Sequence, residues 1–108
     1  MRGSNKTTLV LNAFTTAASW YKKAAYGGHV FSQFVLANHY TSGTGIEKNL
    51  TEAYALLNIV IGKADGTTVV MAQKNLAGIE KEMSNAEIEQ GKLRIGQLEA
   101  LIKASTRK

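Results

Sequence analysis

The stretch that decides the fold is AASWYKKAAYGGH (residues 17–29), which is followed by YTSGTGIEKN (residues 40–49). Its alanine, aromatic and glycine positions recur imperfectly from Ala53, 36 residues after Ala17. A fixed period of this length is typical of proteins built from stacked pairs of helices, each pair being one structural unit. The sequence therefore predicts an all-α superhelix, or solenoid, of antiparallel helix pairs with about five helices.

Apolar residues spaced by three and four positions predict the individual helices over residues 7–26, 29–41, 50–63, 68–82 and 84–104. Gly27–Gly28 suits a helix C-terminus, Asn49 suits an N-cap, and Ser84 with Glu87 forms a capping-box sequence. The resulting division is a disordered leader or tag remnant (1–6), a first helix pair with the repeat loop (7–48), a second helix pair (49–83), a C-terminal capping helix (84–104) and a frayed tail (105–108).

These residues resemble the SEL-one-like repeat family, a tetratricopeptide-like class of paired helices. The first unit carries the family pattern at Ala17, Trp20, Tyr21, Ala24, Ala25, Gly28, His29, Leu36, Tyr40, Gly43, Gly45, Ile46, Asn49 and Ala53. The second unit departs from it, because Leu56 stands for the tryptophan, Val60 and Ile61 for two alanines, and Ala64 for the glycine. The segment that follows is similar to the closing part of many bacterial members, in which one extra helix seals the last repeat. The resemblance also implies that Trp20, Tyr21 and Tyr40 pack between helices.

Composition argues against several classes of function. The net charge is +5, but five of the 13 basic residues lie near the termini and Lys22–Lys23 is the one internal basic doublet, which does not favour a nucleic-acid site. The absence of cysteine excludes disulfides and thiolate metal sites. No stretch approaches the roughly 20 apolar residues of a membrane span. Residues 2–18 make a poor export signal, so the compartment stays open between bacterial cytoplasm and periplasm.

Catalytic and metal sites are not expected. His29 and His39 are ten residues apart, whereas a helical metal or catalytic pair needs a spacing of three or four. The carboxylates do not form a pair that would share one helix face and one pocket. We therefore predict a protein that is not an enzyme, with no catalytic residue, cofactor or metal.

The predicted function is a scaffold that presents a concave helical face to a peptide or protein partner. Lys22 and Asn58 occupy first-helix positions that line the inner groove in this fold class, while Tyr26 and Tyr54 are expected to be exposed; these four are the candidate partner-binding residues. The alternative is a homo-oligomeric assembly module, such as a homodimer, that uses the first hairpin and the fifth helix. The apolar residues of that helix form a heptad-like seam, which suits either packing on the fourth helix or a dimer, at Ile88, Ile95, Leu98 and Ile102.

Overall fold

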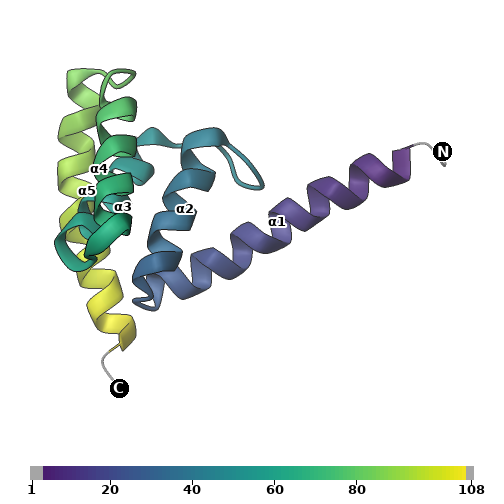
Figure 1. The fold of residues 1–108 in the computed structure, drawn as a ribbon, viewed down its shortest axis with the longest axis horizontal. Coiled ribbons are helices and arrows are strands. Elements are labelled where there is room, and N and C mark those ends of the chain that lie inside the picture. Colours follow the sequence, from purple (N-terminus) through teal and green to yellow (C-terminus); the bar gives the residue numbers. More distant parts are fainter. Residues whose placement is uncertain (1–3, 107–108) are drawn as a thin grey trace.

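The structure is a computed structural model that describes residues 4–106, and the side chains of residue 10 and of residues 12–106. This part of the chain forms five helices and no strand: α1 (Ser4–Tyr26), α2 (Val30–Ser42), α3 (Leu50–Lys63), α4 (Gly66–Glu80) and α5 (Asn85–Thr106) (Figure 1). The predicted all-α class with five helices is confirmed. The first helix already includes residues 4–6 of the predicted leader, whereas residues 1–3 and 107–108 lie outside the described residues.

Three of the predicted helix ends carry the expected capping contacts, whereas α1 begins three residues earlier than predicted and α4 spans Gly66–Glu80 instead of residues 68–82. Asn49 Oδ1 accepts a hydrogen bond from the amide of Glu52 at 3.0 Å, which caps α3. The capping box of α5 is complete, since Ser84 Oγ accepts from the Glu87 amide at 3.1 Å and Glu87 Oε1 accepts from the Ser84 amide at 2.8 Å. Gly28, with a φ of 103°, makes the tight turn between α1 and α2.

The core is organised around α3, which has α2, α4 and α5 packed on its sides. Residues 52–57 of α3 are all buried, a run that no single helix face could bury on its own. The neighbours contribute mostly aliphatic and aromatic side chains, namely Phe34, Leu36, Ala37 and Tyr40 of α2, Ala72 and Ile79 of α4, and Leu98 and Ile102 of α5.

The main neighbour of α5 is α3 and not α4, and α5 also contacts α1 near its C-terminal end. The prediction that α5 offers a dimer seam is therefore wrong, because its residues pack against the core of their own chain. Leu98 is 0% exposed and Ile102 is 3% exposed, while Ile88 and Ile95 are half-buried against the same core. The spacing identified the apolar stripe correctly, but a stripe alone does not show whether its own chain or a second copy covers it.

The N-terminal half of α1 projects away from the other helices (Figure 1). At 13 residues, α2 is shorter than the 23-residue α1, so it covers only the C-terminal half. Val10 and Phe14 lie on the same helix face as the buried Ala18, yet they are 51% and 44% exposed. The apolar face of α1 is therefore buried in the core near its C-terminal end and exposed near its N-terminal end.

The aromatic residues of the repeat pattern have different environments. Tyr40 is buried and Tyr21 packs half-buried against the core, as the resemblance implies. Trp20, however, is 67% exposed, so its expected role in packing is wrong. It follows the buried Ala18 by two positions, which places it on the opposite side of the helix, and Lys23 Nζ lies 5.8 Å from the centre of its ring.

Candidate functional site

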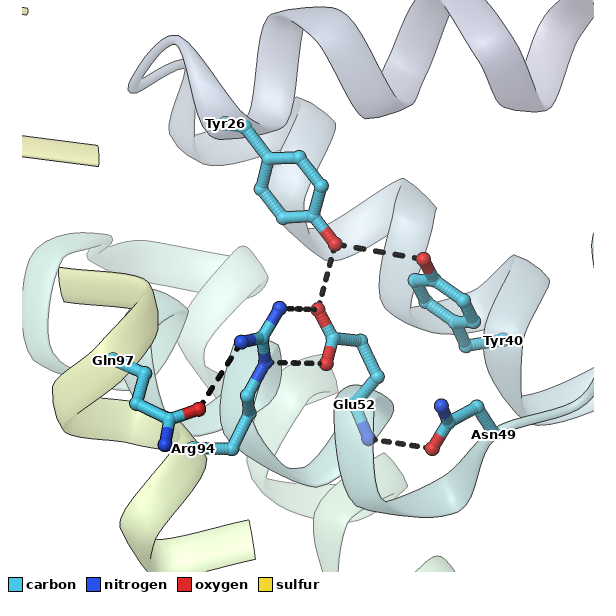
Figure 2. Close-up of polar contacts among 6 residues, drawn as sticks. All are labelled: Tyr26, Tyr40, Asn49, Glu52, Arg94 and Gln97. Atoms are coloured by element: carbon cyan, nitrogen blue, oxygen red, sulfur yellow. Dashed lines mark hydrogen bonds and ion pairs between the residues drawn. The ribbon is translucent and has the colours of Figure 1, made fainter. Parts of the chain in front are cut away.

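A buried carboxylate, that of Glu52 at the start of α3, joins α1, α3 and α5 in one polar cluster (Figure 2). Arg94 of α5 donates from Nε to Glu52 Oε1 at 2.8 Å and from Nη2 to Oε2 at 3.2 Å. Tyr26 at the end of α1 donates its hydroxyl proton to Glu52 Oε2 at 2.6 Å. The forked geometry of a guanidinium on a carboxylate fixes direction as well as distance, so the cluster orients three helices.

The cluster extends at both ends (Figure 2). The hydroxyls of Tyr26 and Tyr40 lie 3.5 Å apart, and Gln97 Oε1 accepts from Arg94 Nη1 at 3.2 Å. Burial, followed by the hydrogen bond to Glu52, raises the pKa of Tyr26 well above its ordinary value of 10.0. The same carboxylate raises the pKa of Arg94 through its hydrogen bond. At pH 7, Tyr26 is thus an uncharged hydrogen-bond donor and Arg94 is a cation. Both states stabilise a cluster that holds three helices together.

Two of the candidate partner-binding residues are less exposed than the sequence suggests. Tyr26 is half-buried, since its hydroxyl turns inward to Glu52. Tyr54 is 6% exposed, so the prediction that it is exposed is wrong. Its ring lies against Gly91 of α5, where a Cβ atom would come within 2.5 Å of Tyr54 Cδ1. The fifth helix covers this part of α3, which could not be read from the spacing within α3.

The other two candidates, Lys22 and Asn58, do not lie in one groove. Asn58 is half-buried, its Nδ2 donates to the carbonyl of Tyr54 one turn earlier at 2.9 Å, and it lines neither of the hollows that Lys22 lines. Lys22 is exposed on α1. It lines two hollows, one of which is also lined by Tyr26 and the other by Tyr40.

These two hollows form what we call the inner groove, which lies between α1, the 43–49 loop and the C-terminal part of α5. The hollow on the α5 side has a volume of about 370 Å³ and is lined by Ser19, Lys22, Lys23, Tyr26, Gly27, Leu101 and Ser105. The hollow on the loop side has a volume of about 400 Å³ and is lined by Lys22, Tyr40, Ile46, Glu47, Lys48 and Asn49. The Glu52 cluster adjoins both hollows, because Tyr26 lines one, Tyr40 lines the other, and both tyrosines belong to the cluster.

The histidines have structural partners. His29 Nδ1 lies 2.6 Å from Ser32 Oγ and accepts from the Ser32 amide at the start of α2, while His39 Nδ1 lies 2.7 Å from the carbonyl oxygen of Thr44. Within residues 4–106, no three histidine or carboxylate side chains come together as a metal site would need. The same residues include no helix with the length and apolar character of a membrane span.

The Glu52–Arg94 pair is the part of the site that sequence reasoning missed. In the sequence, Glu52 is an acidic residue in the first turn of a helix, a position that the helix dipole alone explains, so it does not indicate an ion pair. Arg94 follows it by 42 positions, and it reaches Glu52 only because α5 folds back along α3. Among the described residues, Glu52 is the charged residue that is buried, and this burial would have indicated a partner. The sequence alone does not show which residues are buried.

Comparison with known proteins found no matching family model, no similar curated protein and no similar solved structure. The resemblance to SEL-one-like repeats therefore stands on the motif residues themselves. The structure shows an all-helical fold, whereas the solenoid arrangement and the family assignment stay predictions.

Proposed function

We propose that this chain is a non-enzymatic interaction scaffold that holds a peptide or protein segment in its inner groove. The observation that supports this most directly is the position of Lys22, which borders both hollows, so that an extended segment crossing this side chain would contact the two in succession. Two such open hollows suit an extended segment better than a small molecule, which needs one enclosed cavity. The resemblance to helical repeats supports the same function.

The groove is held in shape before any partner binds. The Glu52 cluster ties α1 to α3 and α5 beside it. On the loop side, Gly45 adopts a φ of +75° and lies so close to α1 that a Cβ atom would collide with the carbonyl of Phe14. A preorganised surface loses less conformational entropy on binding, which favours affinity.

The groove offers both kinds of anchor that peptide recognition uses. Leu101 is 45% exposed beside the ring of Tyr26 and can take an apolar side chain. Lys22 can contact polar or charged groups from either hollow. Binding energy in such surfaces concentrates in a few central residues, so these are the ones to change.

The test is selection of binders from a displayed library of random peptides, followed by calorimetric titration of the full chain with the enriched peptides. Lys22→Ala and Leu101→Ser should each weaken binding about fivefold or more, since central anchors contribute at least about 1 kcal/mol. Lys63→Ala and Leu93→Ser are matched controls, because both residues are exposed and line neither hollow. Failure to enrich any peptide, or equal losses in groove and control variants, would refute the proposal.

A second candidate function is homo-oligomeric assembly through the first hairpin. It is favoured by the exposed Val10 and Phe14, which extend the core-facing stripe of α1 past the end of α2. The fifth helix gives it no support, since its predicted seam is buried within the chain. Light scattering at several concentrations separates the two functions: a dimer that Phe14→Glu dissociates would favour assembly.

A further inference from the structure

Charge is distributed unevenly between the two walls of the inner groove. All eight acidic residues lie at or after Glu47, whereas the preceding part of the chain carries Arg2, Lys6, Lys22 and Lys23 and no acid at all. The wall that α1 contributes is therefore purely positive. The other wall, α5, contributes the apolar Leu101 and the neutral Ser105 to the same hollow.

Lys22 and Lys23 of α1 are not neutralised by an ion pair within the described part of the protein. Among the side chains that the structure describes, the ion pairs join Lys48 to Glu82, Lys92 to Glu89 and Arg94 to Glu52. Neither Lys22 nor Lys23 takes part in one. The carboxylate of Glu52, in the cluster beside the groove, already accepts from Tyr26 and Arg94 on its two oxygens. Positive charge thus remains available to an occupant.

The charge also has a direction along the groove. The hollow on the α5 side is lined by both lysines and by no carboxylate. The hollow on the loop side includes Glu47, which is exposed, and Lys48, which is paired with Glu82 at 3.8 Å. An acidic segment is accordingly favoured at the α5 side, and the loop side is closer to neutral.

We infer that the segment held in the inner groove is acidic, with carboxylates that face Lys22 and Lys23 and an adjacent apolar side chain that packs on Leu101. This inference rests on the proposed function and specifies the chemistry of its partner. The apolar contact supplies affinity, and the two lysines supply selectivity and a faster encounter. An anionic membrane fits less well, because the lysines line a hollow with walls on two sides rather than a flat face.

The experiment uses two labelled peptides that differ only in charge: one in which aspartates and glutamates flank a leucine, and one with asparagines and glutamines in their place. Fluorescence anisotropy with the full chain should show the acidic peptide binding about tenfold more tightly, because each of two exposed ion pairs contributes up to about fivefold. The difference should shrink as salt rises above about 0.1 M, where screening acts over about 10 Å.

Variants locate the effect. Lys22→Gln and Lys23→Gln should each weaken the acidic peptide by up to about fivefold and leave the amide peptide unchanged. Lys63→Gln, an exposed lysine outside both hollows, should change neither. Leu101→Ser should weaken both peptides together, because the apolar contact does not depend on charge.

The outcomes separate this inference from the proposed function. Equal binding of both peptides would refute the acidic partner and leave the proposed function supported. The same conclusion would follow if the only peptides that bind are neutral ones selected from the library, in a way that depends on Leu101. If no probe and no selected peptide binds, both are refuted. Binding to phosphatidylcholine–phosphatidylserine vesicles that depends on Lys22 and exceeds binding to the acidic peptide would replace the peptide by a membrane.

Discussion

The substitution Glu52→Gln tests whether the polar cluster holds the helices together. Glutamine matches glutamate in size, so packing around α3 is preserved. The carboxylate accepts from Arg94 at 2.8 and 3.2 Å and from Tyr26 at 2.6 Å, all of them donors. The amide NH₂ of glutamine must therefore face at least one donor, and the charge of Arg94 loses its partner.

The expected magnitude follows from burial and geometry. A hydrogen bond to a charged group contributes about 1.5–3 kcal/mol, and breaking a fully buried ion pair costs about 3–5 kcal/mol. Glu52 is buried, but the Arg94 side chain is 33% exposed and can regain contact with water, which lowers the cost. We expect a loss of about 2–3 kcal/mol in the free energy of unfolding, or about 10–20 °C in Tm for a domain of this size.

The measurement is urea denaturation followed by far-ultraviolet circular dichroism. Glu89→Gln is the matched control: the same substitution, in an exposed ion pair with Lys92 at 3.3 Å, should cost less than about 0.5 kcal/mol. Adding Arg94→Gln to Glu52→Gln should cost less than the sum of the two single changes. Equal losses for Glu52→Gln and Glu89→Gln would show that the cluster does not hold the helices.

Three further predictions concern stability, each measured by denaturant unfolding. Gly91→Ala should destabilise the protein by about 1–3 kcal/mol, because its Cβ would lie 2.5 Å from Tyr54. Gly96→Ala, with open space around it, should stabilise the protein by about 0.5–1 kcal/mol. The same sign for both changes would contradict the packing of α5 on α3. Leu98→Glu should unfold the chain rather than separate a dimer, since Leu98 is 0% exposed; a folded Leu98→Glu monomer would refute this. Above about pH 10 the Tyr26 hydroxyl loses its proton in the unfolded state, whereas its raised pKa keeps the proton bound in the folded state. The free energy of unfolding should therefore fall as pH rises, and Tyr26→Phe should make that fall less steep. An unchanged slope in Tyr26→Phe would contradict the burial of Tyr26.

The sequence predicted the helices well because their ends carry local signals. Asn49, Ser84 with Glu87, and Gly28 act within one turn of the chain, and each does in the structure what its residue type favours. The inward faces of α2, α3 and α4 likewise follow from spacing alone. These features depend on near neighbours, which a sequence shows directly.

The errors about which side chains are buried concern which element covers a given helix face. Trp20 lies outside the core because α2 packs on the opposite side of α1, and Tyr54 lies inside it because α5 packs over α3. The Glu52–Arg94 pair depends on the same placement of α5. Such contacts are set by the path of the whole chain, and neither spacing nor residue type within one helix determines them.

The central position of α3 has a consequence for how the protein opens. Because α2, α4 and α5 all pack on it, its backbone amides can exchange with solvent only when most of the fold is lost. The projecting half of α1 has no such neighbours, so its amides can exchange through fraying that leaves the rest intact. Hydrogen exchange should therefore divide the chain into a slow unit centred on α3 and a fast one at the start of α1, with the boundary near Phe14, where Gly45 of the loop meets α1.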